Sequence, residues 1–255
     1  MIDKKKVFSE DVEKICNENI RRFVYQRICE LPDYFFTTAA SSTGKYHPSY
    51  SLGDGGLVRH TKAAVKIGAE LLRLEQYRNQ FNELEQDCIL AAIILHDGMK
   101  HGLNGSKYTV AEHPTVMANY LLDIKTDLEK DIVKLISDNI ASHMGEFNTD
   151  FKTKKEILPK PQTESQKFVH LCDYLASRKY LTVDFDSYYQ PKNYEVNKLN
   201  DLIDEIIAVC KTKIGAGVDR EDLYAKIEEV NGNKNPRAIK DESIAQEILN
   251  LINQM

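Results

Sequence analysis

Residues 91–100 of the chain read AAIILHDGMK, a continuous apolar run that ends in a histidine, a carboxylate and a glycine. A helix this apolar is expected to be buried, and a buried His96–Asp97 pair is costly unless a hydrogen-bond network or a bound cation satisfies it. Asp97 also comes near the end of its helix, where the dipole disfavours an anion, so a metal ion is the more attractive partner. The alternative, on these residues alone, is a capping or salt-bridged Asp97 beside a core histidine that is already hydrogen-bonded.

The chain's length and composition indicate an ordinary globular protein. Its 255 residues can bury one large core, or one core with a small appendage. No apolar run approaches the roughly 20 residues that cross a bilayer, and no signal-peptide pattern is present. A net charge of -5 does not indicate a large nucleic-acid surface, although a local basic patch would suffice for a short single strand. Five scattered cysteines without CxxC spacing are interpreted as reduced core thiols of a cytoplasmic protein: Cys16, Cys29, Cys88, Cys172 and Cys210.

Apolar residues at helical spacing predict helices along nearly the whole chain, and no alternating pattern predicts a strand, so the expected fold class is all-α. Residues 1–185 are expected to form the main domain and residues 186–255 a helical C-terminal extension. This extension could be a lid, a dimerisation surface in a homo-oligomer or a winged-helix-like appendage. The predicted helices cover residues 9–31, 57–75, 84–100, a stretch starting at 113, 128–143, 164–179, 192–211, 219–230 and 241–255.

A stretch of about two dozen residues, 33–56, interrupts this helical pattern with small, hydroxyl-bearing and glycine residues. Loops of that length inside a compact domain tend to be functional or disordered. Its aromatic residues, with Lys45 and Tyr46, favour a loop that packs and clamps a ligand. A floppy connector is the alternative.

Five predicted helices or helix ends each carry a metal-competent side chain on an inward face. Imidazole and carboxylate are ligands suited to Mn, Fe, Zn and similar ions, and Asp97 could bridge two of them. Such a two-metal centre suits phosphoester hydrolysis, because it generates hydroxide near neutral pH and stabilises charge on the attacking and leaving oxygens. Independent core histidines could explain any one position, but five coincidences are harder to dismiss. The candidate ligands are His60, His96 and Asp173 for one ion, His113 and His143 for the other, and Asp97 between them.

This pattern resembles the HD-domain metal-dependent phosphohydrolases, whose H, HD and distal D motifs match His60, His96-Asp97 and Asp173. The resemblance covers about residues 30–185 and implies a helical bundle that holds two divalent ions, Mn or Fe first, with Zn, Ni, Co or Mg as alternatives. The extra histidines of the binuclear subgroup are matched by His113 and His143. HDGMK also resembles the HDxxK variant, which implies that Lys100 binds or polarises the scissile phosphate.

Within that superfamily, SSTGKYHP, GGLVRHT, SHMG and LCDYL are similar to motifs of YhaM-type 3'-to-5' exoribonucleases. The expected difference is the absence of a preceding OB-fold that would hold single-stranded RNA. Met144 after His143 argues against a third metal, and the GYP motif of cyclic-di-GMP enzymes is missing.

A nucleotide, a short oligonucleotide or a cyclic dinucleotide is therefore the expected substrate, with Lys45, Tyr46, Arg59 and Arg178 as candidate contacts beside Lys100. Two alternatives stay open. One is a mononuclear nucleotidase, and the other is a non-catalytic module that senses nucleotides.

Overall fold

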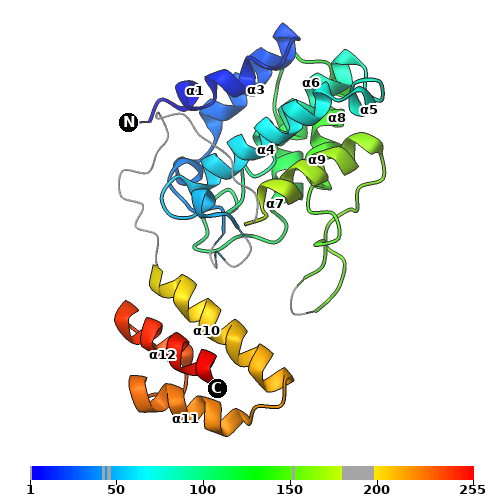
Figure 1. Ribbon diagram of the computed structural model, residues 1–255. Helices are drawn as coiled ribbons and strands as arrows, with labels where there is room; N and C mark the ends of the chain where they lie inside the picture. The colour runs from blue at the N-terminus through cyan, green and yellow to red at the C-terminus, as the bar shows by residue number, and fades with distance from the viewer. Residues whose placement is uncertain (1, 42–43, 45–46, 151–152, 180–197) are drawn as a thin grey trace. The chain divides into compact units, whose positions relative to one another are not determined.

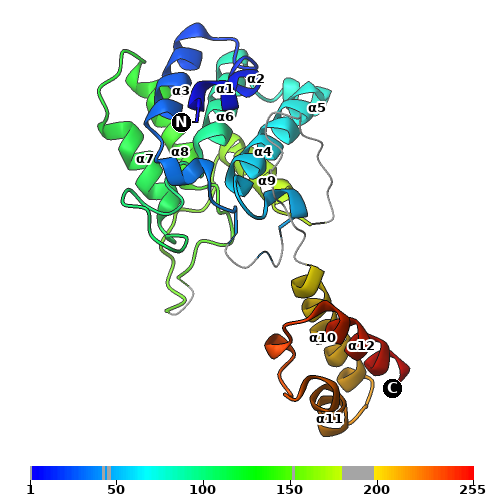
Figure 2. The ribbon, with the colours of Figure 1, turned by 90° about the vertical axis from the view of Figure 1, so that its left-hand side faces the viewer.

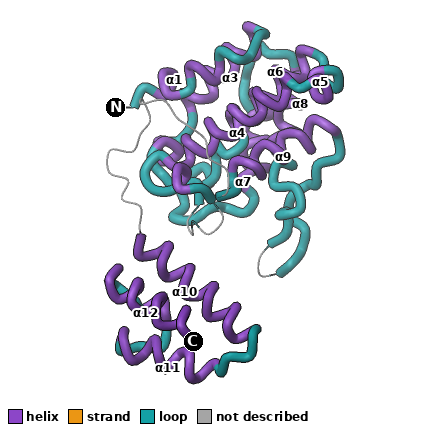
Figure 3. The backbone as a smooth tube through the Cα atoms, in the orientation of Figure 1, coloured by secondary structure: helices purple, strands orange, loops and turns teal. Residues whose placement is uncertain are grey.

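The computed structural model describes residues 2–41, 44, 47–150, 153–179 and 198–255. These residues form helices and loops, as Figure 3 shows, and the all-α prediction is confirmed. The chain divides into two compact units, Met1–Lys192 and Asn193–Met255. This division and the expected boundary after residue 185 both fall within residues 180–197, outside the described residues. No helix in the described ranges combines the length and apolarity needed to cross a membrane.

Helix α6 (Glu83–Leu95) is the central element of the first unit and the helix that carries the apolar run (Figure 1). Asn82 caps its first turn, accepting from the Glu85 amide while the Glu85 carboxylate accepts from the Asn82 amide. From Asp87 to Leu95 every side chain is buried, because α6 contacts other helices around its circumference. Those helices are α3 (Glu18–Glu30), α4 (Gly56–Arg73), α8 (Lys130–Ala141) and α9 (Glu164–Ala176).

The remaining elements of this unit cover the bundle. Helix α7 (His113–Asp123) packs on α8, and α4 also packs on α9, an arrangement that can be followed in Figures 1 and 2. The shorter elements are α1 (Lys4–Val7), α2 (Ser9–Val12), η1 (Asp33–Phe36), η2 (Ser49–Ser51) and α5 (Glu75–Arg78).

The prediction of one helix over residues 9–31 is wrong, because the chain breaks between α2 and α3. The carboxylate of Asp87 accepts hydrogen bonds from the backbone amides of Cys16 and Asn17, both at 2.8 Å. Asn17 then caps α3 by accepting from the amides of Asn19 and Ile20. A buried acid some seventy residues away in sequence therefore sets where α3 begins.

The described part of the 33–56 loop packs against the bundle. Phe35 and Phe36 are fully buried, and the Leu57 amide donates to the Thr38 carbonyl. A Cβ on Gly56 would come within 2.2 Å of the Ser51 carbonyl oxygen, so only glycine allows this close approach. Packing is therefore the better interpretation for the described part of the loop.

The cysteines are all free thiols, as predicted, but only three are in a core. Cys88 and Cys172 are buried in the first unit and Cys210 in the second. The prediction of a core position is wrong for Cys16 and Cys29, which are exposed. Cys16 lies in the break between α2 and α3, and Cys29 lies on an exposed side of α3.

The second unit consists of α10 (Lys198–Gly215), α11 (Arg220–Asn231), η4 (Pro236–Ala238) and α12 (Glu242–Gln254). It has its own core, in which Ile206, Ile227 and Ile248 are fully buried. Residues 198–255 include no strand, so the winged-helix interpretation does not describe them.

Candidate metal centre

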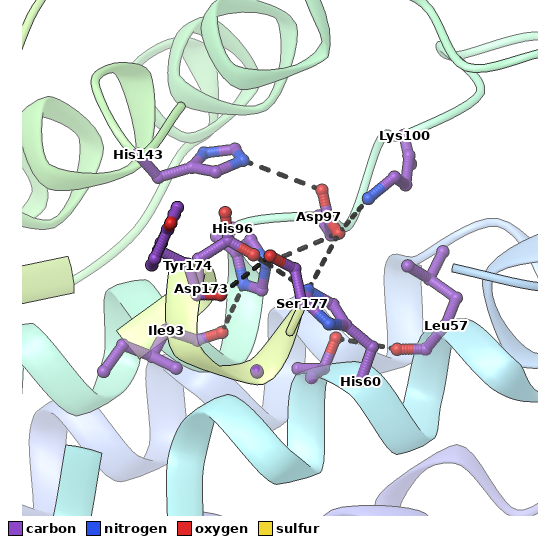
Figure 4. A network of polar contacts seen from close by, with 12 residues as sticks. Leu57, His60, Ile93, His96, Asp97, Lys100, His143, Asp173, Tyr174 and Ser177 are labelled. Atoms are coloured by element: carbon purple, nitrogen blue, oxygen red, sulfur yellow. Dashed lines mark hydrogen bonds and ion pairs between the residues drawn. The ribbon is translucent and has the colours of Figure 1, made fainter. Parts of the chain in front are cut away.

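The six predicted ligands come together at one end of α6, as Figure 4 shows for five of them. His60 lies in α4, His96 caps the C-terminus of α6, and Asp97 follows in the turn. His113 begins α7, His143 follows the end of α8, and Asp173 lies in α9. Five of the six are almost completely buried, whereas the Asp173 side chain retains 18% of its exposure.

The two carboxylate oxygens of Asp97 face different histidines. Oδ2 lies 3.4 Å from His96 Nε2 and 3.7 Å from His60 Nε2. Oδ1 lies 3.0 Å from His113 Nε2 and 3.7 Å from His143 Nε2. Within each set, the candidate ligand atoms lie within 4.8 Å of one another. Asp97 therefore stands between two three-residue clusters, each able to hold a cation.

Asp173 adds a second carboxylate to the His60 and His96 side. Its Oδ1 lies 2.9 Å from His60 Nε2 and 3.5 Å from His96 Nε2. Asp173 also forms a group with His96 and His143 in which the candidate ligand atoms lie within the same 4.8 Å limit. The two clusters are thus contiguous rather than separate sites.

Backbone carbonyl oxygens orient three of the histidines in the same way. The Nδ1 atoms of His96, His113 and His143 each contact the carbonyl oxygen three residues earlier, at 2.7, 2.8 and 2.8 Å. An N–H at Nδ1 that donates to a carbonyl leaves the Nε2 lone pair for a metal. The three imidazoles therefore present Nε2 toward the cluster.

The residues fit a metal ion, because several of their buried polar atoms lack a hydrogen-bond partner within the described residues. These atoms are His96 Nε2, His113 Nε2 and Asp97 Oδ1, and the 3.0 Å contact between the last two lacks hydrogen-bond geometry. Unpartnered buried polar atoms are rare and costly, so a group of them that converges on one point calls for a ligand. A divalent cation with an affinity for nitrogen and oxygen matches this donor set.

The charges in the cluster agree with this interpretation. Burial acts to raise the pKa of Asp97, but Lys100 and His96 hold it well below its usual range. Burial acts to lower the pKa of His96, but the carboxylates of Asp97 and Asp173 raise it. Burial also lowers the pKa of His143, to about 3. The carboxylates of Asp97 and Asp173 thus favour positive charge in the cluster, and a divalent ion can supply that charge.

Of the candidate substrate contacts in the described residues, Lys100 lies at the cluster and Arg59 does not. The Nζ atom of Lys100 lies 2.5 Å from Asp97 Oδ2. Arg59 does not face the cluster with its guanidinium: it is buried and donates to the carbonyls of Tyr50, Asp54 and Leu52. This geometry supports a role in holding the 33–56 loop rather than a substrate.

The remaining candidates lie elsewhere. Arg178 is partly buried just beyond α9, and its guanidinium donates to the Ser177 hydroxyl at 2.7 Å. Lys45 and Tyr46 lie outside the described residues.

Two histidines that were not predicted as site residues, His47 and His170, contact candidate ligands of the centre. The ring of His47 lies 5.6 Å from that of His60, and burial lowers its pKa to about 3. His170 supports His143: its Nδ1 lies 2.7 Å from the His143 carbonyl oxygen, and its Nε2 lies 3.0 Å from Glu146 Oε2. His170 precedes Asp173 by three residues on α9, so its position on the same face was the available signal.

Residues 57–178 match the family model of the HD domain. Comparisons with curated proteins and with solved structures give no match. The matched range begins three residues before His60 and ends after Asp173, so it contains all six ligand candidates and Lys100. HD domains generally bind divalent metal ions, in agreement with the clusters. The match does not distinguish branches of the superfamily. Residues 57–178 thus match the HD domain in sequence, and the helical architecture and the geometry of the site agree with that match.

Proposed function

We propose that this HD domain is a metal-dependent phosphohydrolase or phosphodiesterase with a binuclear centre. Its substrate is the phosphoester of a nucleotide, a short single-stranded oligonucleotide or a cyclic dinucleotide. The observation that carries the proposal is the orientation of Asp97, whose Oδ1 and Oδ2 face separate pairs of histidines. A carboxylate so placed can bridge two cations, and paired cations suit in-line displacement at phosphorus.

Each residue then has a defined role. His60, His96 and Asp173 would hold one ion, His113 and His143 the other, and Asp97 both. When bound, such ions acidify water and offset the charge that develops on phosphate oxygens.

Lys100 adds a compact positive charge beside Asp97, where it can contact an oxygen of the scissile phosphate. His170 fixes the His143 carbonyl and so positions that ligand.

Metal counting and a substrate panel test this proposal together. Elemental analysis of protein loaded with manganese or iron should give two ions per chain, and the loaded protein should release product from at least one phosphoester class. The panel comprises mononucleotides, cyclic dinucleotides and short RNA and DNA strands. The resemblance to YhaM-type enzymes makes 3'-to-5' shortening of a strand the pattern to examine first.

The outcomes separate the alternatives. One ion per chain with turnover would favour the mononuclear nucleotidase, since His60, His96, Asp97 and Asp173 alone could form a single site. Nucleotide binding without product would favour the sensing module. A protein that takes up no ion in manganese-rich solution would overturn the hydrolase proposal.

A further inference from the structure

We propose that Phe147, Tyr174 and Arg178 form a stacking subsite for the nucleobase of the substrate. This inference rests on the proposed function, because it names the part of that substrate which the protein recognises. The subsite implies that the substrate is a phosphoester that carries a base, whether the base belongs to a free nucleotide or to the end of a single strand.

The two rings have the geometry of a stacking platform. Their planes are nearly parallel, 9° apart, with centroids separated by 6.5 Å. Aromatic pairs in direct contact have centroids about 4.5–7 Å apart, so this pair is near the upper limit and gains little from its own contact. Phe147 keeps 52% of its surface exposed. An exposed phenylalanine beside a parallel ring is an unfilled apolar surface that suits a flat partner.

Arg178 completes the stack on the Tyr174 ring. Its guanidinium carbon lies 4.2 Å from the ring centroid, within the range of a cation–π contact. Nε and Nη2 are oriented by the Ser177 hydroxyl, at 3.1 and 2.7 Å. Nη1 has no hydrogen-bond partner in the described part of the chain. The group therefore pairs flat π faces with a positive charge, a combination that suits a base linked to phosphate.

Both rings are tied to ligands of the metal centre. Tyr174 follows Asp173 directly on α9, and Figure 4 shows it beside the cluster. Phe147 lies four residues after His143, and His170 joins this segment to α9 through the His143 carbonyl and the Glu146 carboxylate. The segments that carry the two rings therefore also carry the candidate ligands His143 and Asp173, which places the platform beside the metal centre.

Binding of matched ligands with and without a base tests the subsite. The probes are the phosphonate analogues of AMP and of ribose 5-phosphate, in which a methylene group replaces the ester oxygen and prevents hydrolysis. We expect the manganese-loaded protein to bind the AMP analogue roughly 5- to 150-fold more tightly by calorimetry, the value of one stacked base. The same comparison is made with a phosphorothioate tetranucleotide whose 3' residue is either normal or abasic. A preference for the normal residue shows that the subsite binds the base at the end of a strand and not only that of a free nucleotide.

Substitutions assign the effect to the rings. Phe147→Leu and Tyr174→Leu should each remove most of the preference for the base and leave the ribose analogue unaffected, whereas Phe147→Trp should keep the preference. Tyr224→Leu is a matched control, because Arg220 lies over the Tyr224 ring in the second unit at 5.5 Å. Phe147 is half exposed, so its variants test the idea without disturbing a core.

Two results would overturn the subsite: equal affinity for the base-bearing and base-free probes, or a base preference that both leucine variants retain. Phosphate release from unmodified AMP and ribose 5-phosphate is measured separately. Hydrolysis of both without a base preference would remove the subsite and leave the hydrolase proposal standing. A ring-dependent base preference in a protein that releases product from no member of the full substrate panel would remove the hydrolase proposal and leave the subsite standing.

Discussion

Replacing Asp97 should abolish both metal sites at once, whereas replacing a histidine should abolish one. The reason is geometric: Oδ1 of Asp97 faces His113 and His143, while Oδ2 faces His60 and His96. We therefore compare Asp97→Ala and the isosteric Asp97→Asn with His113→Ala, and use stabilisation by manganese as the measure of binding.

The expected magnitude follows from ligand linkage. An ion that binds only the folded state at a hundredfold excess over its Kd contributes about 2.7 kcal/mol to the free energy of unfolding. In a domain of this size, that corresponds to a rise in Tm of about 5–10 °C per ion. The wild-type protein should therefore gain about 10–20 °C from two independent ions, His113→Ala about half of that, and the Asp97 variants almost nothing.

Melting curves followed by circular dichroism, with manganese or with EDTA, give this shift for each variant against its own metal-free value. Because each variant is compared with its own metal-free form, the manganese shift does not include any change in Tm that the substitution itself causes. Asp138→Ala serves as the control, since Asp138 is a partly exposed acid, away from the candidate ligands, that pairs with Lys134 on α8. If Asp97→Asn kept the full manganese shift, or if His113→Ala lost all of it, the bridging geometry would be refuted.

Three further predictions address other parts of the first unit. Lys100→Met should keep metal uptake but lower kcat/KM by roughly 10²- to 10³-fold, because charge stabilisation at the phosphate is lost; an unchanged rate would remove Lys100 from the mechanism. Gly145→Ala should destabilise the fold by at least about 1–2 kcal/mol from its left-handed backbone alone. The Cβ added at position 145 would also come within 2.3 Å of the His170 ring. Melting curves should therefore show a lower Tm for this variant and a smaller rise in Tm on adding manganese. In the native protein, Cys16 and Cys29 should react with a thiol reagent before the three buried cysteines, whose thiol pKa burial raises; mass spectrometry of labelled peptides would show any other order.

The candidate ligands could be named from the sequence because each lies at a position that local pattern makes conspicuous. His60 follows the apolar stripe of one helix, and His96 and Asp97 end an entirely apolar run. His113 precedes a proline that starts a helix, and His143 precedes the glycine stop at residue 145. Helical periodicity and capping depend on neighbours within about four residues, so a single sequence contains them.

Contacts between distant segments could not be predicted in this way. The break before α3 depends on Asp87, and the orientation of Arg59 depends on loop carbonyls whose positions only the packed chain defines. His47 belongs to a loop without periodicity, so nothing in its neighbourhood indicated that its ring would meet His60.

The sequence by itself determined the all-helical fold, the central buried element and the identity of the candidate metal ligands. Only the tertiary structure decided how they meet: which oxygen of Asp97 faces which histidines, and that Phe147 lies parallel to Tyr174. The physical reason is that propensity, periodicity and capping act over one or two helical turns. The direction of a side chain within a shared site depends on how helices far apart in the chain pack together.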